Sequence, residues 1–212
     1  TTKKKVGFKV QGDKALIKSL INNLSFQLTQ SQINALYEIL ADIESDSKMN
    51  RLLQGDVGSG KTIVVLLAAM FVVSGGHQVA IMAPTEVLAM QHMKSLKEVL
   101  RVEMINKLNI TILTGSDNRS ERERKLLLIA NGEAKIVIGT HALFQKNVHF
   151  HSLRLAVIDE QHKFGVMQRF RLEKKGNVNS IIMSATPIPR SLALTVFSDR
   201  DLTTIKEKPK NR

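Results

Sequence analysis

The strongest constraint on the fold is an unbroken apolar run at residues 63–73, directly after a glycine-rich segment at residues 55–62. The run has 11 residues, fewer than the ~18 or more of a membrane span, and predicts a helix buried on all sides. Another apolar run, at residues 51–54, precedes the glycines and suits a buried strand. Strand, glycine loop and buried helix in immediate succession predict the first unit of an α/β fold.

The same alternation continues along the chain. Runs typical of buried strands lie at residues 51–54, 78–83, 110–114, 135–139, 153–159, 180–184 and 202–205, and helical segments at residues 62–73, 86–100, 119–130, 164–173 and 190–197. A first helix is expected near residues 15–24, and a second, capped by Thr29, has an apolar stripe of Ile33, Leu36, Tyr37, Leu40 and Ile43. The pattern predicts one α/β domain with a mostly parallel sheet of about seven strands and helices on both faces.

The charge balance favours a polyanionic partner. With 31 Lys and Arg against 19 Asp and Glu, the net charge is +12, which suits nucleic acid, although solubility alone would also account for it. One basic cluster consists of Arg119, Arg122, Arg124 and Lys125 and another of Lys163, Arg169, Arg171, Lys174 and Lys175; a solvated helix face is the alternative for the first. Aromatic residues are few, so we expect contacts that follow a sugar–phosphate backbone rather than base stacking.

Cysteine is absent, which excludes disulfides, thiol nucleophiles and cysteine-ligated metals. No apolar segment follows Lys3, Lys4 and Lys5 as it would in a signal peptide, so we expect a cytoplasmic protein without a membrane partner.

The glycine-rich segment matches the phosphate-binding pattern G-x-x-x-x-G-K-[ST]. Its residues are Gly55, Asp56, Val57, Gly58, Ser59, Gly60, Lys61 and Thr62. Glycines allow successive N–H groups to turn toward one anion, Lys61 would reach the β- and γ-phosphates, and the Thr62 hydroxyl would bind Mg²⁺. A glycine turn that merely caps the helix is disfavoured, because all the defined positions match in a strand–loop–helix context.

An acidic pair follows the apolar strand at residues 153–159. Asp159 and Glu160 would lie beside the phosphate loop, because parallel strands end at one edge of the sheet. There Asp159 would hold Mg²⁺, and Glu160 would orient and deprotonate the water that attacks the γ-phosphate. The pair alone would indicate a solvated turn; the phosphate loop favours the catalytic interpretation.

Other strand ends carry hydroxyl groups. Ser184 and Thr186 would sense Asp159 and the γ-phosphate, with a helix-capping turn as the alternative. Three further loops follow strands at Pro84 and Thr85, at Gly115, and at Thr140 and His141. Each is an ordinary helix cap by itself, but three at one edge favour binding of a nucleic-acid backbone. His149 and His151 are interpreted as structural.

Six segments together resemble a known family. GDVGSGKT, APTEVLAMQH, TGS, IVIGTHALFQ, VIDEQHKFGVMQR and MSATPIPRSLALT, in that order, resemble the first RecA-like motor lobe of the RecG family of superfamily 2 DNA helicases. The resemblance covers roughly residues 26–212 and implies remodelling of branched DNA, such as replication forks and Holliday junctions, in repair and recombination.

The resemblance also implies residue roles. Phe26, Gln27 and Gln32 would read adenine; Lys61, Thr62, Asp159 and Glu160 would bind and hydrolyse ATP with Mg²⁺; His162, Ser184 and Thr186 would couple hydrolysis to DNA; and Thr85, Gly115, Thr140 and His141 would lie on the DNA side.

The family also requires a wedge domain and a second RecA-like lobe with a Q-x-x-G-R-x-G-R motif, and neither lies in these 212 residues. We expect residues 1–25 to lead in from the wedge domain, residues 26–205 to form the ATP-binding lobe, and residues 206–212 to start the inter-lobe linker. Such a lobe alone is expected to hydrolyse ATP slowly and not to unwind DNA.

Two alternatives stay open. One is the motor lobe of the transcription-repair coupling factor, which typically reads DEEHRFGV where this chain reads DEQHKFGV. The other is a P-loop nucleic-acid-binding module with weak ATPase activity. A transporter ATPase does not fit, because the stretch before the acidic pair, HFHSLRLAVIDE, lacks an LSGGQ-like signature.

Overall fold

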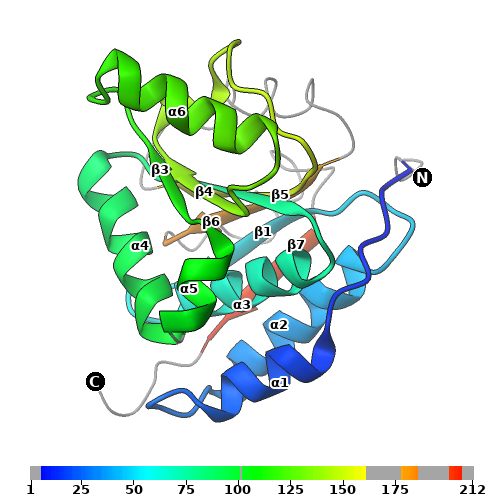
Figure 1. The fold of residues 1–212 in the computed structure, drawn as a ribbon. Coiled ribbons are helices and arrows are strands. Elements are labelled where there is room, and N and C mark those ends of the chain that lie inside the picture. The colour runs from blue at the N-terminus through cyan, green and yellow to red at the C-terminus, as the bar shows by residue number, and fades with distance from the viewer. Residues whose placement is uncertain (1–5, 101, 161–177, 186–200, 207–212) are drawn as a thin grey trace.

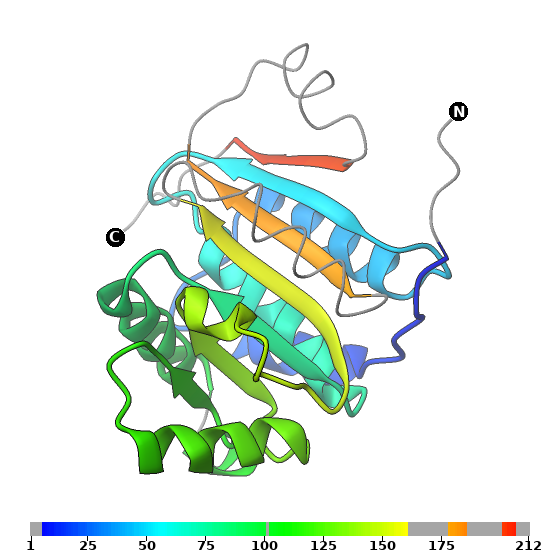
Figure 2. The same cartoon turned by 90° about the horizontal axis from the view of Figure 1, so that it is seen from above.

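Seven parallel strands form the central sheet of the computed structural model, which describes residues 6–100, 102–160, 178–185 and 201–206. The strands are β1 (Asn50–Gly55), β2 (Gln78–Met82), β3 (Thr111–Leu113), β4 (Ile136–Gly139), β5 (Leu153–Glu160), β6 (Asn179–Ser184) and β7 (Asp201–Ile205). They lie in the order β3-β4-β2-β5-β6-β1-β7, and every neighbouring pair is parallel (Figure 2). The predicted parallel sheet is confirmed.

Helices cover both faces of the sheet (Figure 1). On one face lie α1 (Lys14–Asn22), α2 (Gln30–Ile43), α3 (Lys61–Ser74), α4 (Glu86–Val99) and α5 (Val102–Leu108), and on the other α6 (Arg119–Ala130) and the short 3-10 helix η1 (His141–Phe144). Each face of the sheet has its own hydrophobic core. Because successive strand residues point to opposite faces, Leu53 packs in the core beneath α1 to α5 and its neighbour Leu52 in the core beneath α6 and η1.

Helix α3 lies at the centre of the larger core. All of its residues from 63 to 73 are buried, and the helix contacts β1, β2 and β5 as well as α1, α2 and α4. The apolar run is therefore a buried helix, as predicted. Within the described ranges, no helix is long and apolar enough to cross a membrane.

The segment before α2 is part of the same core. Asp13 caps α1 by accepting hydrogen bonds from the N–H groups of Ala15 and Leu16 at 2.9 and 3.0 Å. Ile17 and Leu20 of that helix are buried against α3.

Phe8 ties the start of the described chain to the amino ends of β2 and β5. The guanidinium carbon of Arg154 lies 3.8 Å from the centre of the Phe8 ring, and the ring of His77 meets Phe8 edge-on at 5.7 Å between centres. His77 Nδ1 and Ser152 Oγ share a hydrogen bond of 2.7 Å. This cluster lies at the edge of the sheet opposite the loops that follow the strands.

Tyr37 departs from the predicted stripe of α2. Its side chain is 59% exposed, whereas Leu36 and Leu40 are buried against α3 together with Ala35 and Ile39. Consecutive helical residues are rotated by about 100°, so the buried face centred on Leu36 and Leu40 turns position 37 toward solvent. The prediction for Tyr37 was wrong because its ring was counted as apolar without regard to that rotation.

Two short elements were not predicted, α5 and η1. Each is too brief to show a clear hydrophobic period, which emerges over 11 or so residues. The predicted helices at residues 164–173 and 190–197 lie outside the described residues.

The contrast on α2 can be tested with neighbouring residues. Leu36→Ala is expected to lower the free energy of unfolding by about 2–5 kcal/mol, because it opens a cavity against α3. Tyr37→Ala is expected to change it by about 0.5 kcal/mol or less, because the ring is mostly in solvent. Urea unfolding followed by circular dichroism measures both. Equal losses in the two variants would contradict the assigned helix face.

The Phe8 cluster predicts a pH dependence of stability. Burial lowers the pKa of His77, and the positive charges of Arg154 and Lys135 lower it further. Below about pH 6.5 the unfolded chain therefore binds a proton that the folded state takes up less readily, so stability falls as the pH decreases. His77→Asn keeps a polar group for Ser152 but does not titrate. Urea unfolding at pH 7.5 and 5.5 should show a smaller loss in this variant than in the parent; an equal loss would exclude His77 as the source.

Candidate functional site

The phosphate loop joins the end of β1 to the start of α3. Gly58 and Gly60 have φ angles of 80° and 82°, in the left-handed region that favours glycine. Ser59 N–H donates to the Asp56 carbonyl at 3.1 Å, which closes the loop on itself. Helix α3 begins at Lys61, so its free N–H groups and positive dipole end lie at this loop. The conformation suits an anion.

Gln32 of α2 contacts the backbone of the phosphate loop. Its Oε1 accepts from Thr29 N–H at 2.9 Å, which completes the capping box of α2, and its Nε2 donates to the Ser59 carbonyl at 2.8 Å. The side chain is fully buried. Gln32, which the family resemblance assigned to adenine, thus lies against the loop backbone and ties α2 to it.

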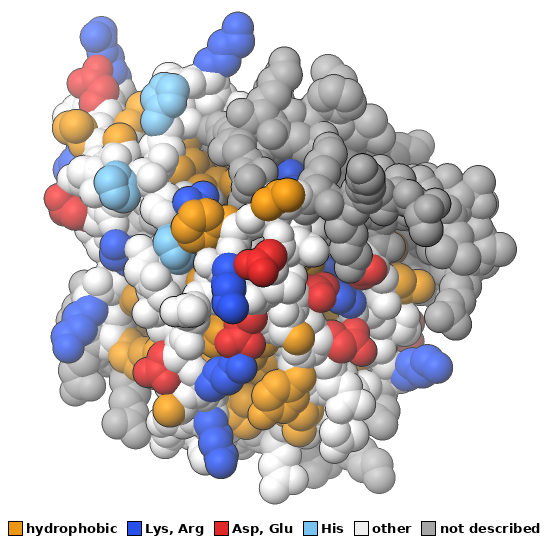
Figure 3. All heavy atoms as spheres, turned by 90° about the vertical axis from the view of Figure 1, so that its right-hand side faces the viewer, with side chains coloured by type: hydrophobic (Ala, Val, Ile, Leu, Met, Phe, Trp, Pro, Cys, Tyr) orange, Lys and Arg blue, Asp and Glu red, His pale blue; other side chains and the backbone are white. Residues whose placement is uncertain are grey.

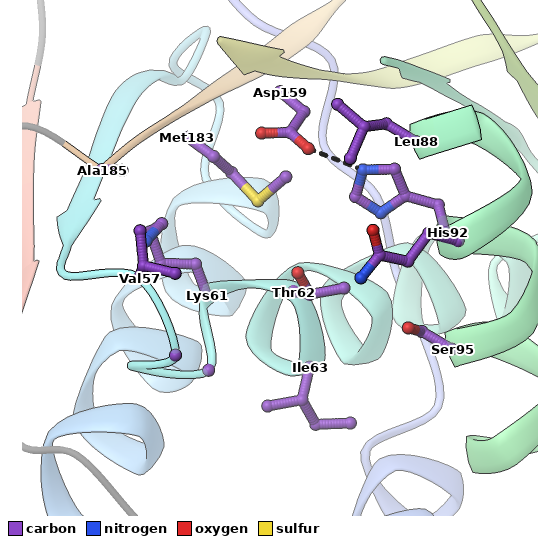
Figure 4. Close-up of a pocket in the computed structure, with 13 residues that line it drawn as sticks. Val57, Lys61, Thr62, Ile63, Leu88, His92, Ser95, Asp159, Met183 and Ala185 are labelled. Carbon is purple, nitrogen blue, oxygen red and sulfur yellow. Dashed lines mark hydrogen bonds and ion pairs between the residues drawn. The ribbon is translucent and has the colours of Figure 1, made fainter. Parts of the chain in front are cut away.

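A cavity of about 290 Å³ opens above the loop, between α4 and the ends of β5 and β6 (Figure 4). Its lining consists of Val57, Gly58, Gly60, Lys61, Thr62, Ile63, Leu88, Gln91, His92, Ser95, Asp159, Met183 and Ala185. Lys61, Thr62 and Asp159, which are 98 positions apart at most in the sequence, therefore share one cavity.

The ammonium group of Lys61 is held against the first two residues of the phosphate loop. Its Nζ donates to the carbonyls of Gly55 at 2.5 Å and Asp56 at 2.9 Å. Burial lowers the pKa of this ammonium group, while the carboxylates of Asp159 and Asp56 act in the opposite direction. A half-buried cation beside an acidic group is the electrostatic setting that an anionic ligand would complete.

His92 contacts Asp159 within the cavity. Its Nε2 lies 2.8 Å from Asp159 Oδ2, and the two side chains are 7% and 18% exposed (Figure 4). Thr85 was predicted as a functional residue from the same segment, whereas His92 and its neighbours were not. Leu88, Gln91 and Ser95 line the cavity with it at helical spacing, and that period is the signal that could have identified the face.

Other residues predicted to bind or sense the nucleotide lie away from the Lys61 cavity or outside the described part of the chain. Phe26 and Gln27 line a second cavity of about 550 Å³ beside α1 and the start of α2, separate from the one at Lys61. Ser184 is buried at the end of β6, where its backbone is paired in register with Glu160 of β5. The side chain of Glu160, and His162 and Thr186 entirely, are not among the described groups.

The predicted nucleic-acid residues follow three neighbouring strands. Pro84 and Thr85 come after β2, Gly115 after β3, and Thr140 and His141 after β4, and these strands adjoin in the order β3-β4-β2. All are exposed except Thr140, which is buried. Thr85 also caps α4 by accepting from Leu88 N–H at 3.2 Å. The topology thus gathers the three loops at one edge.

Side chains link these loops. The Glu86 carboxylate accepts from Ser116 N–H at 3.3 Å and Ser116 Oγ at 2.9 Å. Arg122 donates to the Thr114 carbonyl at 3.1 Å and to Gln145 Oε1 at 2.6 Å. The loops after β2 and β3 and the end of η1 are therefore held together by the protein's own contacts.

Acidic partners offset the basic cluster on α6. Lys125 Nζ lies 2.6 Å from Asp117 and 3.2 Å from Glu121, and Arg119 pairs with Glu123 at 3.0 Å. This pairing disfavours a free basic patch on α6.

The predicted cluster at residues 163–175 lies outside the described residues. On the face in Figure 3, the Lys and Arg side chains are spread among acidic ones.

The sequence profile named DEAD/DEAH box helicase matches residues 29–195, most of the chain. The chain belongs to the DEAD/DEAH box helicase family. This helicase-family chain is 47% identical over 94% of its length to the ATP-dependent DNA helicase RecG of Borreliella burgdorferi and 50% identical over 90% to that of Streptococcus pneumoniae. It spans 29% and 28% of those relatives, under a third of their length.

A solved structure of RecG bound to a three-way DNA junction superimposes on the helicase-family chain with a TM-score of 0.82. The two are 42% identical, over 98% of this chain and 27% of that one. The predicted resemblance to the RecG family and the predicted RecA-like fold are thereby confirmed.

The two left-handed glycines of the loop allow a matched test. Both Gly58→Ala and Gly60→Ala place a side chain at positive φ, at a cost of about 1–2 kcal/mol. Only at Gly60 would the new Cβ clash with Gln32 Nε2, whereas nothing lies within 4 Å at Gly58. We expect Gly60→Ala to cost at least ~1 kcal/mol more in urea unfolding, because the Gln32–Ser59 bond is displaced. Combined with Gln32→Ala, its effect should be smaller than the sum of the two; additive losses would show that Gln32 is not the obstacle.

Proposed function

We propose that this chain is the ATP-binding motor lobe of a DNA helicase that remodels branched DNA, such as replication forks and Holliday junctions, in repair and recombination. The observation that carries the proposal is one cavity that brings Lys61, Thr62 and Asp159 to a phosphate loop with two left-handed glycines. RecG relatives at 45–50% identity support the DNA helicase class over the transcription-repair coupling factor.

The residues present fit ATP and Mg²⁺. The loop N–H groups and Lys61 would hold the β- and γ-phosphates, and the Thr62 hydroxyl and Asp159 carboxylate are hard oxygen donors of the kind Mg²⁺ prefers. When bound, Mg²⁺ would neutralise charge on the phosphate oxygens. Glu160, directly after Asp159 on β5, would orient the attacking water and accept its proton.

Coupling and base recognition are assigned on the resemblance. His162, Ser184 and Thr186 would relay the nucleotide state to the DNA side, and Phe26 and Gln27 would read adenine. Gln32 would act on the nucleotide through the loop, because its amide contacts the Ser59 carbonyl. The loops at Pro84, Thr85, Gly115, Thr140 and His141 would follow the DNA backbone.

The remaining parts of the machine would come from the same full-length protein. Because the chain spans less than a third of its relatives, we assign residues 1–25 to the lead-in from a wedge domain, 26–205 to the lobe and 206–212 to the linker toward a second RecA-like lobe. An arginine finger from that second lobe would raise hydrolysis by ~10³–10⁵. We further assign the protein to the cytoplasm.

Lys61→Ala tests the proposal and its main alternative, a nucleic-acid-binding module with a vestigial nucleotide site. We expect ATP binding to weaken at least tenfold, about 1.4 kcal/mol, because the phosphate cation is lost. DNA affinity should stay within about twofold of the parent, since Lys61 lies in the nucleotide cavity and not at the loop edge.

Titration with a fluorescent ATP analogue and anisotropy with labelled branched DNA measure the two affinities. Lys97→Ala, in the exposed last turn of α4, controls for loss of one positive charge. Unchanged ATP affinity in Lys61→Ala would reject the nucleotide site, and an equal fall in both affinities would point to misfolding or a merged site.

A further inference from the structure

We propose that His92 is a positioning residue that holds the Asp159 carboxylate in the orientation needed to bind the nucleotide's magnesium ion. The inference rests on the proposed function, because it assigns a role within the same cavity. Neither the phosphate-loop pattern nor the acidic pair points to His92, which comes from a different helix.

The first observation is the contact itself. His92 Nε2 and Asp159 Oδ2 are 2.8 Å apart, and an ionised carboxylate is an acceptor, so the imidazole donates. Occupation of Oδ2 by this donor leaves Oδ1 as the oxygen for a cation. A carboxylate with one oxygen engaged rotates less freely, so its second oxygen is kept in one direction.

The second observation is the rigidity of the donor. His92 is 6% exposed, and on α4 it is flanked at helical spacing by Ala89 and Leu96, both fully buried in the large core. The backbone that carries the imidazole therefore cannot rotate without unpacking that core. A donor held in this way can orient a carboxylate, whereas an exposed side chain could not.

The third observation is the positive charge of Lys61 near Asp159. Asp159 also interacts electrostatically with Lys61, whose Nζ is bound to two loop carbonyls. Without the His92 bond, the carboxylate would be free to turn toward this ammonium group. The His92 donor on Oδ2 opposes that turn, so the carboxylate keeps the orientation that this bond sets.

Removal of a group that orients a metal ligand typically lowers metal affinity by about 10–100-fold. His92→Ala is therefore expected to weaken the Mg²⁺-dependent part of nucleotide affinity by about 10–100-fold. Nucleotide affinity in EDTA should change by less than about threefold, because the phosphate loop and Lys61 are untouched.

In the experiment, the purified 212-residue chain and its variants are titrated with a fluorescent ATP analogue. Each protein is titrated once with excess Mg²⁺ and once with EDTA, and about twofold resolution in affinity is sufficient. The variants are the parent, His92→Ala, His92→Leu, His92→Gln and His149→Ala. His92→Gln retains an N–H donor that can reach Asp159 and should recover most of the Mg²⁺ dependence. His149→Ala removes an exposed histidine outside the cavity and should match the parent.

His92→Leu fills the volume without a donor and carries the same expectation as His92→Ala, should the smaller side chain prevent folding. Mg²⁺ dependence that survives in both would overturn the inference alone. An equal loss of affinity with and without Mg²⁺, not recovered in His92→Gln, would also overturn it, because the effect would then be structural. A parent without Mg²⁺-dependent nucleotide binding would overturn the proposed function, and this inference with it.

Discussion

Burial of α3 beneath the sheet is the constraint on which the rest of the structure depends. Residues 63–73 carry no polar side chain, so this helix is stable only where the sheet, α1, α2 and α4 cover it. Because β1 leads into α3 through a short loop, the same burial brings Lys61 and Thr62 to the edge where β5 ends. Gln32 then fixes the loop to α2. The most apolar segment of the chain thereby positions the phosphate loop and its cavity.

The site is built from groups that restrain one another across three elements. Lys61 comes from the start of α3, Asp159 from β5 and His92 from α4, and each is half-buried or buried. Electrostatic interactions are stronger in such a setting than in water. Burial disfavours the charged form of Lys61, and the nearby carboxylates offset this cost. The half-buried Lys61 at the phosphate loop therefore gives the cavity a positive charge suited to an anionic ligand.

Features specified by a local sequence pattern were predicted correctly, whereas features that depend on a packing partner distant in the sequence were not. Glycines at 58 and 60 are required by the loop's own backbone, so the loop could be read directly. Tyr37 was misplaced because its burial depends on the rotation of α2 against α3. The charges of α6, acidic as well as basic, were visible in the sequence, but the pairing of Lys125 with Asp117 in the loop before the helix became evident only in the structure. His92 was missed because its partner is 67 positions away.

The sequence by itself determined the parallel α/β fold, the buried helix, the phosphate loop and the strand ends that carry polar groups, because each follows from hydrophobic period or from glycine conformation within a few residues. Only the tertiary structure decided which of those polar groups share a cavity. It placed Gln32 under the loop, Phe26 in a separate cavity and His92 against Asp159. The physical reason is that side-chain distances across a sheet edge depend on strand order and helix packing, which no local pattern encodes.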